Sequence, residues 1–160
     1  MKEGKEQINT LIAQIDNDLL AMKNIEDKIE ELYSTMDKDN IKDKDNAALG
    51  YYLHNLYNAV ESILKRLSIF FENSIQGDTW HTDLLKRMAL EIPEVRPTVI
   101  SNKTYVMLNE LRKFRHIFCH AYDYELRFKR MDELWKEYLE NKDYFLKDMN
   151  RINQVLKDMR

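Results

Sequence analysis

The stretch Glu110-Leu-Arg-Lys-Phe-Arg-His-Ile-Phe-Cys-His-Ala-Tyr122 combines a helical apolar pattern with most of the chain's unusual chemistry. Apolar side chains recur here at helical spacing: Met107, Leu111, Phe114 and Phe118. This spacing predicts an amphipathic helix with one face turned toward a protein core. We therefore expect the rest of the chain to supply helices that cover that face.

The same helix carries groups that bind phosphate or exchange protons. At 100° per residue, Arg115 lies in line with Leu108 and Tyr122 on the core-facing side. A guanidinium on an apolar stripe is costly unless an anion meets it. His116 and His120 stand four residues apart on the more polar flank, where they stack one turn above the other. An anion-binding cation beside two imidazoles favours phosphoryl chemistry.

Two long helices are predicted before this one. Residues 3–36 place apolar side chains at alternating three- and four-residue steps, interrupted only by Asp18. We interpret that stripe as part of an intramolecular core. Residues 37–46 mix both charges without an apolar period and predict a solvated connection. The second helix has an apolar face running from Leu49 to Phe71 and is expected to end near Gly77.

The remaining segments complete an all-α architecture. A short helix is expected from Trp80 to about Leu90, capped by Asp78 or Thr79, and prolines at positions 93 and 97 then enforce a non-helical segment. Ser101 or Asn102 can cap the helix of the opening stretch, and a last helix spans about residues 128–156. The expected fold is a bundle of about five helices in one domain, residues 1–160.

Composition limits the possible classes of protein. Charged residues make up 33% of the 160-residue chain and hydrophobic ones 44%, with three glycines and two prolines, which favours long helices. No run is apolar and long enough to cross a bilayer, so no membrane partner is expected. The single cysteine, Cys119, suits a reducing cytoplasm, and we expect it to be buried in packing. A net charge of -3 argues against attraction of nucleic acid by the whole molecule.

The opening stretch offers candidates for RNA cleavage without a metal. That reaction needs a base, an acid and positive charge at the phosphorus. His120 can transfer protons, Arg115 can clamp the phosphate and His116 can assist. Arg115 and His120 diverge by about 140° around a straight helix. Either the helix is distorted near His120, or a second chain completes the site, as a symmetric dimer would. The alternative is a surface ion pair with a polar edge and no catalysis.

These residues resemble a known family. Arg115-His-Ile-Phe-Cys-His-Ala-Tyr122 fits the Arg-x4-His-x-Tyr signature of HEPN-domain ribonuclease toxins, in particular the HepT-like branch, in which a residue such as His116 follows the arginine. Upstream, Glu61-Ser-Ile-Leu-Lys65-Arg66 resembles the Glu-x3-Lys/Arg element of many HEPN domains. Residues 80–88 and the proline segment after them also look like this branch. The resemblance covers about residues 45–126.

The resemblance implies a helical bundle that forms a homodimer, with both Arg-x4-His motifs lining one groove. It implies an endoribonuclease that uses no metal or other cofactor and leaves 2′,3′-cyclic phosphate and 5′-hydroxyl ends. Arg115 and His120 would then be catalytic and His116 supportive. It also implies an antitoxin partner, a minimal nucleotidyltransferase that transfers AMP to Tyr122. The added charge and bulk would repel RNA from the groove.

Several further residues carry weaker interpretations. Glu61 and Lys65 are first an ordinary helix pair and second supporting residues of the site. His54 is expected at the edge of a helix. Arg112 and Lys113 belong to a basic stretch, residues 111–130, where six basic residues outnumber two acidic ones. That patch suits RNA binding, but equally an acidic protein partner. The rival hypotheses are therefore a non-catalytic HEPN-type module that binds nucleotides or a partner, and a plain helical interaction protein.

Overall fold

The computed structural model describes residues 2–73, 80–120 and 126–160, and these form an all-α bundle, as the sequence predicts. Its five helices are α1 (Lys2–Thr35), α2 (Asp43–Glu72), α3 (Trp80–Met88), α4 (Asn102–His120) and α5 (Phe128–Asp158). In the described ranges the only strand-like pairing is one antiparallel bridge between Ile92 and Arg96. Nor does any helix in those ranges contain an apolar stretch long enough to span a membrane.

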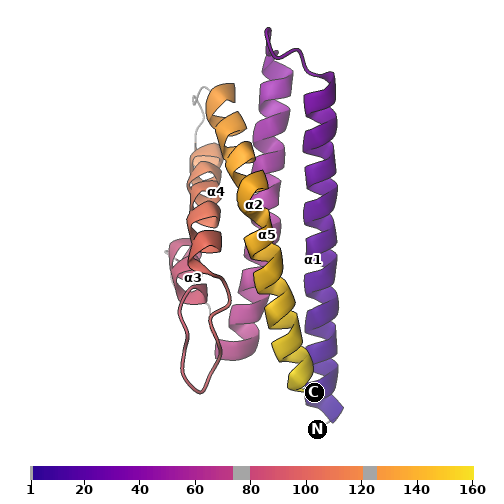
Figure 1. Cartoon of the computed structure of the whole chain (residues 1–160), viewed down its shortest axis with the longest axis vertical. Coiled ribbons are helices and arrows are strands. Elements are labelled where there is room, and N and C mark those ends of the chain that lie inside the picture. Colours follow the sequence, from indigo (N-terminus) through magenta and orange to yellow (C-terminus); the bar gives the residue numbers. More distant parts are fainter. Residues whose placement is uncertain (1, 74–79, 121–125) are drawn as a thin grey trace.

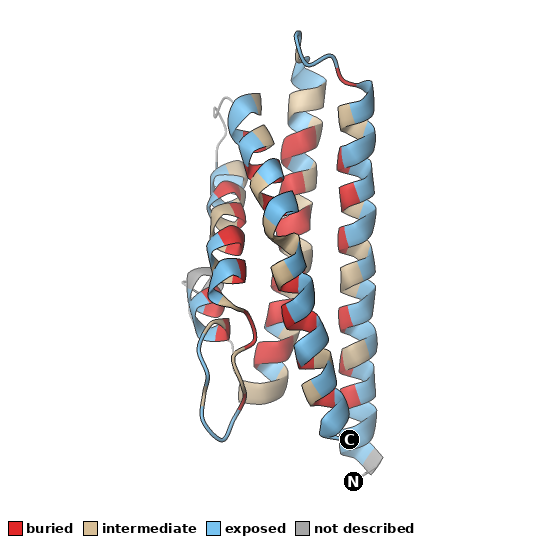
Figure 2. Ribbon diagram, in the orientation of Figure 1, coloured by how far each residue is buried: buried red, intermediate tan, exposed pale blue. Residues whose placement is uncertain are grey.

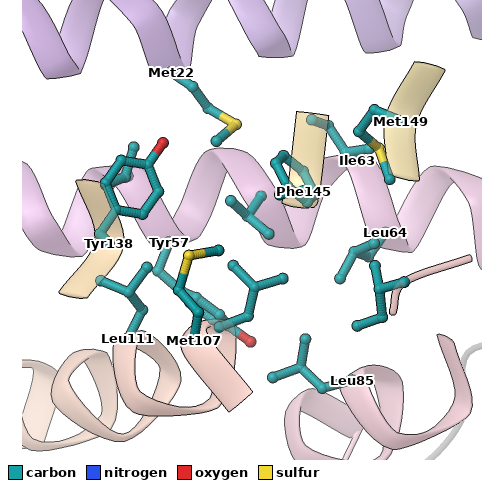
Figure 3. Packing of buried hydrophobic residues seen from close by; sticks show 14 of the residues in the cluster. Met22, Tyr57, Ile63, Leu64, Leu85, Met107, Leu111, Tyr138, Phe145 and Met149 are labelled. Atoms are coloured by element: carbon teal, nitrogen blue, oxygen red, sulfur yellow. The ribbon is translucent and has the colours of Figure 1, made fainter. Parts of the chain in front are cut away.

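Helix α2 is the centre of the bundle. Figure 1 shows α1, α2 and α5 running along the long axis, with α4 beside α2 and α5 and α3 near one end of α4. Each of the other four helices packs against α2. Phe71, at the end of the predicted stripe, is half-buried, and the rest of the stripe is fully buried: Leu49, Leu53, Leu56, Val60, Ile63 and Leu67. Figure 2 shows the buried positions facing inward, and Figure 3 shows how residues from all five helices interlock around them.

Helix α2 ends earlier than the predicted position near Gly77. Its last residue is Glu72, and Asn73 adopts a left-handed conformation with φ of 52°. The Asn73 N–H donates to the Ile69 carbonyl, which closes the helix. Asparagine tolerates this conformation better than most residues, so it can end a helix without glycine. Gly77 and the expected caps of α3, Asp78 and Thr79, lie outside the described residues.

Polar side chains join α1 to the rest of the bundle. Asp18, the interruption in the apolar stripe of α1, accepts hydrogen bonds from Ser62 Oγ and Arg66 Nε of α2, each at 3.1 Å. Buried Glu26 accepts from Tyr138 at 2.5 Å and Lys142 at 2.8 Å, both on α5. Because a buried carboxylate without partners is costly, these contacts fix one position of α1 against the other helices.

The start of α4 is held by α5. Ser101 immediately precedes α4, as the predicted cap should, and its N–H and hydroxyl both donate to Asp148 Oδ2, at 2.8 and 3.0 Å. The buried Thr104 hydroxyl donates to the same oxygen at 2.6 Å. A carboxylate is favourable at the positive end of a helix dipole. Asp148 therefore fixes where α4 begins.

The segment between α3 and α4 is non-helical, as its two prolines predict, and is organised by a buried arginine. Arg96 is 4% exposed, and its Nε donates to Glu72 at 2.6 Å. Its remaining nitrogens donate to the carbonyl of Arg87 in α3 and to those of Leu90 and Pro97 in the segment. Helix α3 ends at Met88, two residues before the expected Leu90. Together these bonds attach the segment to the end of α2.

Candidate active site

The last turn of α4 packs unusually closely against α2. A Cβ atom added to Gly50 would lie 2.9 Å from Phe118 Cε2 and 3.1 Å from Leu126 Cδ1. Such distances are shorter than van der Waals contact, so only glycine fits at this position without displacing its neighbours. The close approach brings the polar residues of α2 within reach of the Arg-x4-His segment.

Arg115 turns toward α2, on the core-facing side that the sequence predicts. Its Nη1 lies 3.4 Å from Glu61 Oε2, and its guanidinium carbon lies 5.9 Å from the ring centre of Tyr57. The Glu61 side chain is 8% exposed and that of Arg115 22%. Glu61 is thus an anion that the half-buried guanidinium requires, and the pair fixes the direction of a permanent positive charge.

His116 and His120 lie on the exposed outer face of α4, one turn apart. Their ring centres are 4.5 Å from each other, and His120 Nδ1 lies 2.8 Å from the His116 carbonyl oxygen. Because a carbonyl only accepts, His120 Nδ1 carries the proton in this bond. Neutral His120 therefore presents the lone pair of Nε2 as a proton acceptor.

Within one chain, Arg115 and His120 do not converge. Helix α4 is regular from Asn102 to His120, so the described part of α4 shows no distortion of the kind considered from the sequence. The two side chains keep the divergence of about 140° that a straight helix imposes. Arg115 contacts α2, whereas His120 is exposed. For these two side chains to share one phosphate, a second chain would have to complete the site.

A histidine of α2 joins the site. The Asn58 amide nitrogen lies 3.0 Å from His54 Nε2, and Cys119 Sγ lies 3.6 Å from His54 Nδ1. Since an amide nitrogen only donates, Nε2 accepts and Nδ1–H points to the sulfur. The His54 ring also packs on Phe118, with ring centres 5.2 Å apart. His54 therefore ties the last turn of α4 to α2.

The expectation that Cys119 is buried is wrong. Cys119 is exposed, because Phe118 fills the adjoining core position and leaves the thiol at the edge of α4 facing His54. Sequence reasoning placed His54 at a helix edge but did not connect it with the site. A signal was present: His54, Asn58, Glu61 and Lys65 follow one another at steps of four, three and four, which places them on one face of α2.

The other predicted site residues differ in environment. Lys65 is exposed at the end of the polar face of α2. Half-buried Arg112 donates from Nε to Asn109 at 3.0 Å, and exposed Lys113 donates to Glu110 at 2.8 Å. Tyr122 lies outside the described residues. Among the residues that are described, no three His, Cys, Asp or Glu side chains are grouped in a way that could hold a metal ion.

The fold and the site define a class: an all-α bundle in which one helix bears an ion-paired arginine on its inner side and paired imidazoles on its outer side. The HepT-like protein family matches residues 48–156, a segment that extends from the first turns of α2 into the last turns of α5. The chain therefore belongs to the HepT-like family of HEPN proteins. No curated protein and no solved structure matches it.

Substitution of Gly50 should loosen the site. We expect Gly50→Ala to lower the free energy of unfolding by about 1–3 kcal/mol, because the added methyl group must displace Phe118 or Leu126. Gly4→Ala is the matched control: nothing lies within 4 Å of a Cβ there, so it should leave stability unchanged or raise it slightly. Urea-induced unfolding gives the free energy of unfolding of both variants. Equal effects of the two substitutions would contradict the close approach.

His54 should make stability depend on pH. Burial lowers its pKa, Arg115 lowers it further, and Glu61 opposes the shift. Below about pH 6.5, the ordinary histidine value, the unfolded chain gains a proton at residue 54 that the folded protein resists. The stability advantage of wild type over His54→Gln should therefore be largest above pH 7 and shrink toward pH 5. Urea unfolding across this range tests the sign, and an advantage that grows in acid would contradict it.

Proposed function

We propose that this protein is an endoribonuclease toxin that cleaves RNA without a metal ion. The supporting observation is the arrangement of side chains on α4. Its inner side holds the Arg115 guanidinium against Glu61, and its outer side holds the His120 imidazole with a defined proton position. Membership of the HepT-like family supports the same activity. Arg115 and His120 are the proposed catalytic residues, and His116 the supporting one.

The proposed reaction is a transesterification followed by release of the cleaved strand. A base removes the proton of the 2′-hydroxyl, and that oxygen bonds to phosphorus as the bond from phosphorus to the 5′-oxygen breaks. An acid gives the departing oxygen its proton, which leaves a 2′,3′-cyclic phosphate and a 5′-hydroxyl. His120 Nε2 is the proposed group for these proton transfers, and the fixed charge of Arg115 stabilises the phosphorane.

The proposal requires a homodimer. Because Arg115 and His120 lie on different sides of a regular α4, a two-fold axis beside that helix would let the arginine of one subunit and the histidine of the other reach one phosphate. Val106, 50% exposed on the outer face of α4, is a large apolar residue available for burial by a second copy. Arg112 and Lys113 would contact the RNA backbone beside the cleavage site.

We further propose that a nucleotidyltransferase antitoxin silences the enzyme by transferring AMP to Tyr122. This tyrosine follows His120 by two residues, so a modification there would be close to the proposed catalytic imidazole. Each phosphodiester-linked AMP adds one negative charge and considerable bulk. Both would oppose the entry of a polyanionic substrate.

Purified protein should cleave RNA in EDTA. Arg115→Ala and His120→Ala should each reduce the rate by at least about 100-fold, because each removes a proton-transfer or charge-stabilising group. Lys28→Ala, at an exposed position of α1, is the control and should cleave like wild type. Gel analysis of a labelled RNA, with end-group mapping, measures rate and products. RNA binding without cleavage by wild type at any concentration would favour the non-catalytic module instead.

Modification is tested by intact-mass measurement. After co-expression with a partner nucleotidyltransferase, the toxin should gain mass in whole AMP units, and Tyr122→Phe should abolish the gain because no phenol oxygen remains to accept the nucleotide. The neighbouring Tyr124→Phe is a matched control and should still be modified. AMP that persists on Tyr122→Phe would place the modification elsewhere.

A further inference from the structure

A pocket of about 160 Å³ lies between α4 and the first turns of α5. Its apolar wall includes Phe114 and Ile117 of α4 together with Met131 and Leu134 of α5. Phe114, Met131 and Leu134 are buried in the core, whereas Ile117 remains 39% exposed at the surface. The pocket is thus an apolar recess that opens beside the outer face of α4.

Cations surround this recess. Lys113, Arg127 and Arg130 line it, and Glu110 is the one carboxylate among the lining residues. Lys113 and Arg130 donate to Glu110 at 2.8 and 3.2 Å, and the hydrogen bond from Lys113, together with the charges of both cations, holds the pKa of that carboxyl below its usual range. Glu133 Oε2 also lies 3.8 Å from Arg130 Nη1, so three cations face two carboxylates and one positive charge remains in excess. An anion would be attracted to the edge of the recess.

The volume of the recess limits the size of the ligand that it can bind. An apolar cavity of about 150 Å³ is large enough to bind benzene. A volume of 160 Å³ therefore accommodates one six-membered ring, whereas a fused two-ring system would extend into solvent. A pyrimidine nucleotide fits this site. It has one flat ring, which the apolar side chains can hold, joined to a phosphate, which the cations can hold.

The pocket is close to the proposed cleavage site. Ile117 precedes His120 by three residues, a rise of about 4.5 Å along α4. Lys113 precedes His116 by three residues as well, so the basic edge of the pocket and the two imidazoles follow the same stretch of helix. A nucleotide in the pocket would place its neighbouring phosphodiester beside His120.

We propose that this pocket binds the base of a pyrimidine nucleotide next to the scissile phosphodiester, and so sets where the RNA is cut. This inference rests on the proposed ribonuclease function for its role, but the binding itself does not depend on cleavage. The apolar wall supplies contact with the base, and Lys113, Arg127 and Arg130 hold its phosphate.

Direct binding measurements test the proposal. Uridine 5′-monophosphate should bind wild type, and ribose 5-phosphate, which lacks the base, should bind at least about tenfold more weakly. Adenosine 5′-monophosphate should also bind more weakly than the pyrimidine nucleotide. Calorimetry or titration followed by NMR gives the dissociation constants. Equal binding of uridine 5′-monophosphate and ribose 5-phosphate would overturn the proposal.

Matched variants locate the binding. Ile117→Trp should fill the recess and weaken binding of uridine 5′-monophosphate at least about tenfold. Leu139→Trp is its control on α5, because the exposed fractions of the two original residues are similar, 37% for Leu139 and 39% for Ile117. Arg127→Ala should weaken binding, whereas Lys129→Ala, two residues further along the chain and outside the pocket lining, should not. Binding that survives Ile117→Trp would place the nucleotide elsewhere.

The outcomes separate this proposal from the proposed function. Nucleotide binding in the pocket without RNA cleavage would reject the enzyme and keep the site. Cleavage that shows no preference for pyrimidines, with no binding of uridine 5′-monophosphate, would reject the site and keep the enzyme. Binding that strengthens only when the protein is diluted to monomers would mean that a second copy of the chain fills the pocket, which would also overturn the proposal.

Discussion

The ion pair between Glu61 and Arg115 sets the geometry on which the proposed activity depends. A guanidinium on the inner side of α4 is tolerated because a nearly buried carboxylate of α2 lies 3.4 Å from it. The pair directs the positive charge toward α2. On a regular helix this leaves His120 on a different side, so the same contact that stabilises the arginine separates it from the imidazole. The proposed ribonuclease activity therefore requires a second subunit.

The helices around α4 hold this arrangement at both of its ends. Asp148 binds the first turn through three hydrogen bonds, and Gly50 lets the last turn approach α2. His54, with its ring on Phe118 and its Nδ1–H toward Cys119, adds a contact to that last turn. Catalytic groups need support of this kind, because small displacements are costly in rate. The family match begins in α2 and leaves out α1, which is joined to α2 and α5 through Asp18 and Glu26.

Apolar periodicity was enough to predict the helices and the inward direction of Arg115, because both follow from the geometry of a regular helix. The end of α2 was misplaced because Asn73 closes the helix in a conformation for which glycine is the usual signal. Cys119 was misjudged because residue type favours burial, whereas its angle on α4 points to His54. Spacing along α2 places His54 on the same face as Glu61, but it does not specify that His54 contacts Phe118 and Cys119 of α4.

Mixed dimers test most directly whether one subunit supplies the arginine and the other the histidine. Arg115→Ala and His120→Ala subunits carrying different tags would be co-expressed, purified as the heterodimer and assayed for RNA cleavage. The account predicts activity well above that of either variant alone, because one intact pair remains across the interface. A heterodimer of Arg115→Ala with the double variant Arg115→Ala/His120→Ala, which retains no Arg115, should stay inactive. Failure of the first heterodimer to cleave, while wild-type dimers do so, would contradict the account.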